Sequence, residues 1–557
     1  MRFNSSNKSF IMAGLLGVLM LTGVACGRSP ARELSAEEPV SRDAAQGRTI
    51  LQEAPALAEL REAEFDAAAP YPTATASLVP PAAGGDSPPN DAPYDLMFFE
   101  SEGVNPFVDT EDDHFSTFAM DVDTASYSLA RRYLTDGYLP PHDAIRVEEF
   151  INYFDLDYPG PANERDAFAI HLEGAPAPFG PRQSYLLKID LQGKEIAAED
   201  RKDAVLTFVV DVSGSMDREN RLELVKEALG LLVKSLRPTD DVGIVVYGSR
   251  AAVILEPTSA ENDETILAAI DRLQPDGSTN AEEGLRLGYQ MAAQGFRPGA
   301  INRVILLSDG VANVGRTGPE TILQVIRDQV AQGVTLSTVG FGMGNYNDVL
   351  MEQLANDGNG NYAYVDTLDE AHRIFVENLT GTLQVIAKDA KVQVDFDADV
   401  VRSYRLLGYE NRAVADDDFR NDRIDAGEVG AGHSVTALYE IKFHDEADMA
   451  KADTALTLYI RYQDVDSGQV VELSRPLARG EFVTNLAHTS PEFRLIAAVA
   501  EYAEILRGSY WAQDSSFTDV QFLANTVGST FANDDDVLEF LSLLDRAIEI
   551  TQAQIQP

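Results

Sequence analysis

One stretch of the sequence constrains the fold more than any other, because it joins an apolar strand, a polar turn and a helix. Residues 204–210 form an apolar run with Thr207 as its one polar residue, which is typical of a strand buried in a parallel sheet. After the turn, one helical face gathers apolar side chains: Leu222, Val225, Leu229, Leu232 and Val233. This order places the turn at the carboxyl edge of an open α/β sheet, where such folds bind ligands.

The turn has the sequence Asp211-Val212-Ser213-Gly214-Ser215, with oxygen-bearing side chains at alternate positions. Carboxylate and hydroxyl oxygens suit a hard divalent cation. Taken alone, the turn could equally be a helix N-cap, since Asp and Ser are favoured there. Two later segments favour a metal site: Gly277-Ser278-Thr279-Asn280 precedes a helix-patterned stretch, and an apolar strand at 303–308 ends in Asp309.

Together the three loops resemble the metal-ion-dependent adhesion site of von Willebrand factor type A domains, over about residues 202–379. The resemblance implies a site for Mg²⁺ or Mn²⁺ whose ligands, direct or through water, are Asp211, Ser213, Ser215, Thr279 and Asp309. Octahedral coordination leaves one position open, which an acidic side chain of a protein partner could fill. The alternative is a degenerate site that keeps the fold and has lost the ion.

Strands and helices alternate through the same region, which predicts a Rossmann-like, doubly wound α/β sheet. Strands are expected at 242–247, 251–255, 334–341 and 362–365, and helices at 261–273, 281–293, 319–332, 347–355 and 368–379. The strand ends carry neither a Gly-x-Gly-x-x-Gly turn nor a Gly-Lys-Ser/Thr loop. Nucleotide binding is therefore not expected.

The start of the chain has the pattern of a secretory signal, with Arg2 and Lys8 before an uncharged run at 10–25. Cys26 follows and is the single cysteine of 557 residues, so no intramolecular disulfide can form. Gly23-Val24-Ala25-Cys26 resembles a bacterial lipobox, although Gly23 stands where Leu is usual. The resemblance implies acylation of Cys26 and an extracytoplasmic protein anchored to a membrane by lipid, the outer membrane being favoured in a Gram-negative source. A plain secretory signal is the alternative.

Composition and pattern divide the chain into six parts: a signal at 1–26, a disordered Ala/Pro/acidic tether at 27–112, an N-terminal module at 113–200, the α/β domain at 201–380, a β-rich module at 381–485 and a helical segment at 486–557. The N-terminal and C-terminal modules resemble those that accompany type A domains in a family of bacterial lipoproteins. Strand-rich segments on both sides of the α/β domain predict one β-sandwich into which it is inserted. Two separate β modules are the alternative. Asp123-Thr124 is expected to cap a helix that runs to residue 134.

The formal net charge of −46, from 90 acidic and 44 basic side chains, excludes generic nucleic-acid binding, which needs a basic face. We therefore expect a non-enzymatic adhesion or assembly module that binds a protein partner through its metal ion. One alternative is a structural envelope protein with a non-functional metal site. A metal-dependent hydrolase is a weaker alternative, because no catalytic base is evident near the loops.

Overall fold

The computed structural model describes residues 97–120, 122–163, 165–310, 319–343, 346–424, 426–444 and 454–555. The signal pattern and Cys26 lie outside these residues. In the described part, no helix has both the length and the apolar character needed to cross a bilayer. The tether expected over 27–112 is too long at its C-terminal end, since Met97 is buried in a hydrophobic cluster and β1 (Val108–Asp109) pairs with a strand of the sandwich.

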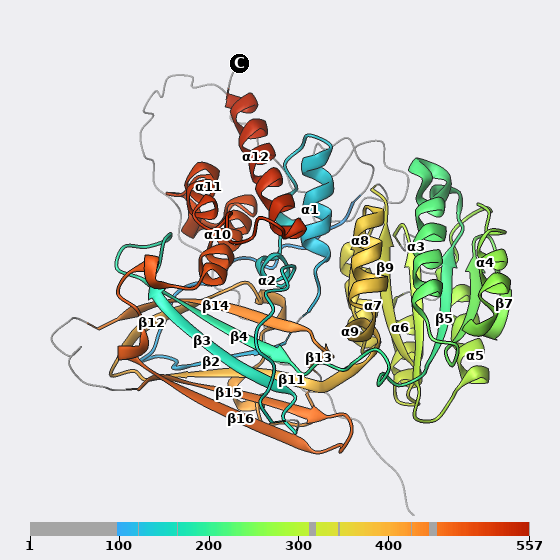
Figure 1. The fold of residues 1–557 in the computed structure, drawn as a ribbon, viewed down its shortest axis with the longest axis horizontal. Helices are drawn as coiled ribbons and strands as arrows, with labels where there is room; N and C mark the ends of the chain where they lie inside the picture. Colours follow the sequence, from blue (N-terminus) through green and yellow to red (C-terminus); the bar gives the residue numbers. More distant parts are fainter. Residues whose placement is uncertain are drawn as a thin grey trace, which may run out of the picture. The chain divides into compact units, whose positions relative to one another are not determined.

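The central α/β domain contains a six-stranded sheet in the order β10-β9-β8-β5-β6-β7 (Figure 1). Its strands are β5 (Ala204–Asp211), β6 (Asp241–Tyr247), β7 (Ala251–Ser259), β8 (Ile301–Ser308), β9 (Thr335–Phe341) and β10 (Tyr362–Val365). Only the β6–β7 pair is antiparallel among these strands. Every residue of β5 is buried, which is why its sequence is almost entirely apolar up to Asp211.

Helices cover both faces of this sheet: α3 (Arg221–Ser235), α4 (Asp263–Ile270), α5 (Ala281–Gly295), α6 (Pro319–Val330), α7 (Asp348–Asp357), α8 (Leu368–His372) and α9 (Leu379–Leu383). One hydrophobic cluster joins the sheet to α3 and α4, and another joins it to α5 and α7. The predicted doubly wound fold is thus confirmed. The single helix expected at 368–379 is wrong in detail, because a π-helical turn at Arg373–Glu377 separates α8 from α9. That turn holds the Arg373 guanidinium over the Tyr153 ring, 4.1 Å from its centre.

Strands from both sides of the central domain share two antiparallel sheets. One has the order β1-β12-β14-β4-β3, and the other has the order β13-β11-β15-β16 with β2 also paired to β11. These strands are β2 (Phe115–Ala119), β3 (Phe168–Pro176), β4 (Tyr185–Gly193), β11 (Val385–Phe396), β12 (Val401–Leu407), β13 (Gly427–Gly430), β14 (Ser434–Phe443), β15 (Thr454–Asp464) and β16 (Val470–Ala478). A single hydrophobic cluster lies between the sheets. The prediction of one sandwich with an inserted α/β domain is confirmed, and two separate β modules are not formed.

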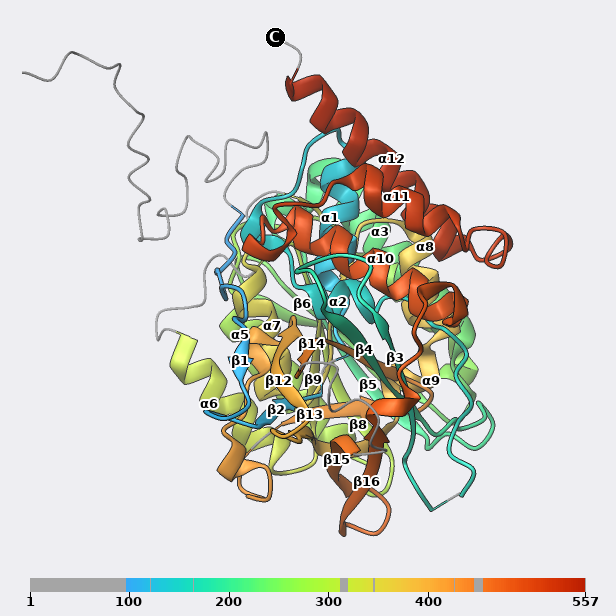
Figure 2. The same cartoon turned by 90° about the vertical axis from the view of Figure 1, so that its left-hand side faces the viewer.

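Helices from the two ends of the described chain pack together beside the sandwich (Figure 2). They are α1 (Ala125–Thr135) and α2 (Val147–Ile151) from the N-terminal part, and α10 (Pro491–Leu506), α11 (Phe517–Asn525) and α12 (Asp535–Ile555) from the C-terminal part. Tyr127, Phe150, Tyr502 and Phe540 are all at most 1% exposed in their common core. The N-terminal module and the C-terminal helical segment therefore form one helical layer.

The prediction that Asp123-Thr124 caps α1 is wrong. Thr124 stands at the N-cap position, but its side chain forms no cap hydrogen bond. Asp123 instead accepts a 2.9 Å hydrogen bond from the Tyr362 backbone N–H and pairs with Arg412 at 3.2 Å. The backbone N–H of Ser126, in the first turn, donates to Glu149 at 2.8 Å. Long-range contacts have replaced the local cap that the sequence favours.

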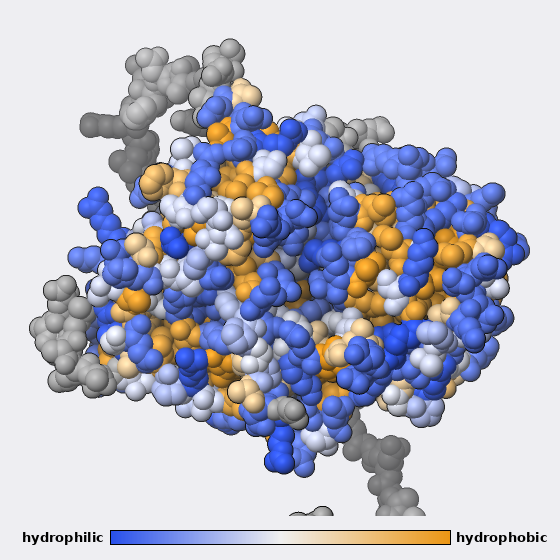
Figure 3. Space-filling view, in the orientation of Figure 1, coloured by the Kyte–Doolittle hydropathy of each residue, from blue (hydrophilic) through white to orange (hydrophobic). Residues whose placement is uncertain are grey.

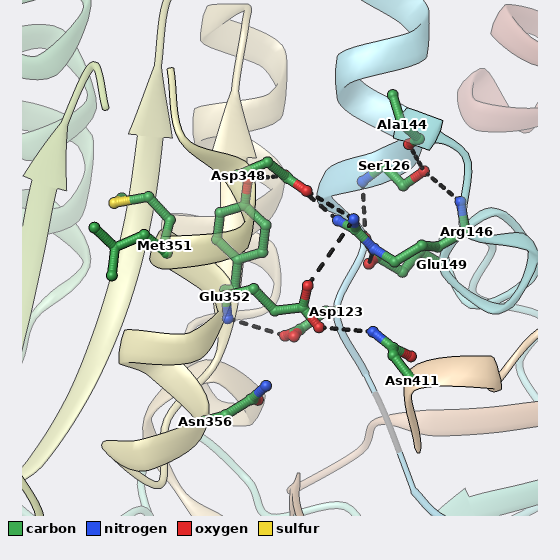
Figure 4. Close-up of polar contacts among 12 residues, drawn as sticks. Asp123, Ser126, Ala144, Arg146, Glu149, Asp348, Met351, Glu352, Asn356 and Asn411 are labelled. Carbon is green, nitrogen blue, oxygen red and sulfur yellow. Dashed lines mark hydrogen bonds and ion pairs between the residues drawn. The ribbon is translucent and has the colours of Figure 1, made fainter. Parts of the chain in front are cut away.

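A buried polar network fastens α1 and α2 to α7 of the central domain (Figure 4). Arg146 forms an ion pair with Asp348 at 2.7 Å and a second with Glu149. Glu352, on the same helix as Asp348, accepts from Asn411 at 3.0 Å. Because these ion pairs are shielded from water and lie between different elements, the network fixes the position of α7 against the N-terminal helices.

Candidate metal centre

Asp211 ends β5 at the carboxyl edge of the central sheet, and its side chain is fully buried. One carboxylate oxygen accepts a 2.8 Å hydrogen bond from the Ser213 backbone N–H, and the other accepts a 3.0 Å hydrogen bond from the Ser308 hydroxyl. These two bonds fix the carboxylate at the sheet edge. Burial, together with the nearby charge of Asp309, raises the pKa of Asp211 to about 6.

The turn after β5 presents the two predicted serine ligands side by side. Ser213 is buried and Ser215 is half-buried, and their hydroxyl oxygens lie 2.9 Å apart. Ser215 also contacts Asp309, because its hydroxyl forms a hydrogen bond with the Asp309 carboxylate that lowers the pKa of that acid. The turn therefore links the first and third loops through hydroxyl groups.

Asp309 follows β8, next to β5 in the sheet, and is 3% exposed. Its carboxylate accepts a 2.8 Å hydrogen bond from Arg221, the first residue of α3. Burial raises the pKa of Asp309, although the hydrogen bond from Ser215 and the Arg221 charge oppose that effect. The structure thus brings Asp211, Ser213, Ser215 and Asp309 into one connected group.

The loop that carries Thr279 is held against the first loop by backbone hydrogen bonds. The Gly214 N–H donates to the Gly277 carbonyl at 2.9 Å, and the Asp276 N–H donates to the Val212 carbonyl at 2.5 Å. Thr279 itself is half-buried, and within the described residues its hydroxyl has no hydrogen-bond partner. Its loop lies next to the other ligands, and its hydroxyl is available for a further contact.

Arg221 is a part of this site that the sequence analysis missed. It is 4% exposed, pairs with Asp309 and also donates to the Met343 backbone carbonyl. Gly342 makes room for it, because a Cβ there would lie 2.3 Å from the Arg221 Nε. One signal in the sequence could have found it: a basic residue at the start of a helix opposes the helix dipole and so indicates a local acidic partner. Ser308 was missed too, although it is the polar residue that directly follows the apolar run at 304–307 of β8.

The chemistry of these groups fits a hard cation with few charged ligands. Among the described residues no three or more His, Cys, Asp or Glu side chains form a group that could hold an ion. An ion at this site would therefore depend on hydroxyl oxygens or water beyond its two carboxylates, which is compatible with Mg²⁺ and less so with Zn²⁺. Besides burial, the negative charge of Asp309 raises the pKa of Asp211, so the two ionised acids repel each other. A cation bound between them would relieve that repulsion.

Comparison with known families matches three parts of the chain. Residues 206–378 match the von Willebrand factor type A domain, residues 94–188 match a family described as von Willebrand factor, and residues 381–550 match the C-terminal domain of the uncharacterized protein YfbK. Among solved structures, a von Willebrand factor type A protein from Catenulispora acidiphila is similar with a TM-score of 0.42 at 14% identity, over 68% of this chain and 89% of that chain.

Individual relatives agree with these matches. The chain is 38% identical over 440 residues to the uncharacterized protein YfbK of Escherichia coli, which covers 75% of each protein. It is 32% identical over 201 residues to the uncharacterized protein sll0103 of Synechocystis, over 36% of this chain and 46% of that protein. Human inter-alpha-trypsin inhibitor heavy chain H4 is 29% identical over 163 residues, or 28% of this chain and 17% of that protein. The chain therefore belongs to the family of Escherichia coli YfbK, and its central α/β domain is a von Willebrand factor type A domain.

Proposed function

We propose that this protein is an extracytoplasmic binding module whose type A domain captures a protein partner through a divalent cation. The observation that carries the proposal is the convergence of Asp211, Ser213, Ser215 and Asp309 at the carboxyl edge of the central sheet, with the Thr279 loop bonded to it. Type A domains are a class of protein-interaction domain, so a protein partner is the natural ligand of this edge.

The predicted ligand residues differ in whether their oxygens already accept or donate hydrogen bonds within the protein. Both oxygens of Asp211 are fixed by hydrogen bonds, while the Thr279 hydroxyl has no partner among the described residues. When bound, Mg²⁺ or Mn²⁺ would supply an open coordination position for an oxygen of the partner. An acidic side chain is the ligand of choice for that position.

Charge explains why the partner should be acidic even though this chain is acidic too. Asp211, Asp309 and Arg221 carry a local net charge of −1 when both acids are ionised, and a divalent cation changes it to +1. The rest of the chain, with a formal charge of −46, would repel an acidic partner, and the face drawn in Figure 3 is largely hydrophilic. The ion would create a local positive charge on a molecule that otherwise disfavours such a partner.

A lipid anchor at Cys26 completes the proposal. An acylated Cys26 would hold the binding domain at a membrane surface, with the Ala/Pro/acidic tether between them. Two or more acyl chains are needed for stable attachment, since one chain gives only marginal binding.

One observation favours a second candidate, a structural envelope protein that uses no ion. Arg221 already neutralises Asp309 through a buried ion pair of 2.8 Å, which a metal-free site would need in order to be stable. Titration with metal separates the two candidates directly.

The experiment is calorimetric titration of the chain from residue 27 onward with Mg²⁺ and with Mn²⁺. We expect saturable binding that weakens at least ~10-fold in Asp211→Ala and in Asp309→Ala, because each change removes one of the two charged ligands. Asp217→Ala is the matched control, since Asp217 is an exposed acid of the same loop, and its affinity should stay at the wild-type value. Equal affinity in all four proteins, or no binding by the wild type, favours the structural role.

A further inference from the structure

We propose that a cavity at the amino edge of the central sheet, opposite the metal loops, binds a small oxyanion-bearing molecule through Arg303 and His433. The cavity has a volume of about 340 Å³, within the range of small-molecule sites. Arg303 comes from the start of β8 in the type A domain, and His433 comes from the turn before β14 in the sandwich. Neither residue belongs to the metal loops.

Arg303 is a buried cation without an acidic partner. Its side chain is 1% exposed, its Nε donates to the Thr335 hydroxyl at 3.1 Å, and one terminal nitrogen donates to the Thr382 carbonyl. Within the described residues it forms no ion pair, and Glu428 is the one acid whose charge acts on its pKa. Burial lowers the pKa of Arg303 to about 10, which leaves the guanidinium charged at neutral pH.

Other buried arginines of this chain show what Arg303 lacks. Arg131 pairs with Glu370 at 2.8 Å, Arg146 pairs with Asp348 at 2.7 Å, and Arg405 pairs with Glu440 at 2.8 Å. A buried charge without such a partner is destabilising, because its lost hydration is not replaced by an opposite charge. In a chain with twice as many acidic as basic residues, an arginine left unpaired beside a cavity indicates that the anion comes from outside.

His433 adds a second group without a partner. Its ring lines the same cavity, and its Nδ1 is buried with no hydrogen-bond partner. Burial and the charges of Arg373 and Arg303 lower the pKa of His433 to about 4, so the ring is neutral at pH 7 and carries one N–H donor. The ring is closely packed, because a Cβ on Gly381 would lie 2.5 Å from its Nε2.

The cavity also carries other charges of both signs. Arg373 pairs with Glu370, whereas Glu377 lies 3.3 Å from His372, a partner that is charged only when protonated. Asp155 and Glu195 also line the cavity, and they would disfavour a large or highly charged anion. A guanidinium fork and a neutral imidazole suit the planar oxygens of a carboxylate or the oxygens of a phosphate. We therefore assign the site to small oxyanions. A carboxylate and a phosphate are tested separately.

The test is titration of the chain from residue 27 onward with inorganic phosphate and, separately, with succinate, at constant ionic strength set by KCl. The ring signals of His433 are followed by NMR, and affinity is measured by calorimetry. We expect one of the two anions to shift the His433 signals in a saturable manner. The exposed His488, which does not line the cavity, serves as an internal control.

Variants then test whether the charge of Arg303 binds the anion. Arg303→Gln should weaken binding at least ~10-fold, because charge-assisted hydrogen bonds to the anion are lost. Arg327→Gln is the matched control, since Arg327 is exposed and already paired with Asp357 at 3.0 Å. Should Arg303→Gln fail to fold, the NMR titration of the wild type and the calorimetric affinity of His433→Gln, which should be weaker than that of the wild type, decide. Unmoved His433 signals with both anions, or wild-type affinity in a folded Arg303→Gln variant, would overturn the proposal.

Discussion

Asp211→Asn should make the metal-free protein more stable at neutral pH while abolishing its response to metal. Asn keeps the size of the side chain, and its amide can still meet the Ser213 N–H and the Ser308 hydroxyl. What it removes is a buried negative charge beside Asp309. The change therefore separates the cost of the metal site from the packing of the sheet edge.

The expected gain in the free energy of unfolding follows from the pKa of Asp211, which rises from 3.8 to about 6 on folding. Because the folded pKa is the higher one, the unfolded chain loses its proton first as pH rises, and stability falls between pH ~4 and pH ~6. A pKa difference of about two corresponds to about 3 kcal/mol at pH 7, and the same linkage gives only about 0.5 kcal/mol at pH 4. Asp211→Asn should recover most of that free energy at pH 7 and little at pH 4.

Hydrogen exchange of the β5 and β8 segments in the presence of EDTA is the appropriate assay, because it reports opening of the central sheet. A gain of about 3 kcal/mol slows exchange through global opening roughly 150-fold. Added Mg²⁺ should reverse the order of stability once its concentration is about 1,000 times its Kd, because it then stabilises the wild type by about 4.1 kcal/mol and leaves the variant unchanged. A variant that is less stable than the wild type at pH 7 in EDTA, or a difference that does not depend on pH, would show that the charge of Asp211 does not destabilise the metal-free protein.

Three further changes test separate parts of the account. Arg221→Met should lower the free energy of unfolding of the metal-free protein by about 3–5 kcal/mol, because it leaves Asp309 buried and unpaired. In thermal melts, saturating Mg²⁺ should recover part of that loss, and a melting temperature unaffected by the substitution would contradict the ion pair. Arg146→Met should destabilise by a similar ~3–5 kcal/mol, since the buried Asp348 and Glu149 lose their common partner; protease sensitivity at α7 measures it, with Arg327→Met as the exposed control. Cys26→Ser should move the protein from the membrane fraction to the soluble fraction or block its processing, and unchanged fractionation would refute the lipid anchor.

The features that the sequence predicted well depend on local pattern. The apolar run before Asp211 and the apolar strand before Asp309 identify neighbouring parallel strands, whose carboxyl ends must share one edge of the sheet. The insertion of the type A domain into a sandwich was also predictable, because strand-patterned segments occur on both sides of it. These properties require only the period of the side chains and the order of the elements.

The features that were missed depend on contacts between distant parts of the chain. Asp123 was expected to cap α1, yet its carboxylate accepts from the Tyr362 N–H, 239 positions away. Residues 97–112 looked like part of the tether because they lack an apolar period, but Met97 packs in a hydrophobic cluster of the central domain and β1 pairs with a strand of the sandwich. Arg303 and His433 lie 130 positions apart in sequence, and no local motif joins them. Pattern fixes which residues form a strand or helix, whereas such pairings depend on the tertiary fold.

Partner capture with and without metal is the decisive test of whether the type A domain binds its partner through the ion. Wild type, Thr279→Ala and Asp217→Ala, each immobilised from residue 27 onward, would be incubated with solubilised cell-envelope proteins in Mg²⁺ or in EDTA, and the bound proteins quantified by mass spectrometry. We predict a partner that the wild type and Asp217→Ala retain in Mg²⁺, that EDTA releases, and that Thr279→Ala captures weakly while melting at the wild-type temperature. A partner retained in full after verified removal of the metal, or captured equally by Thr279→Ala, would contradict recognition through the ion.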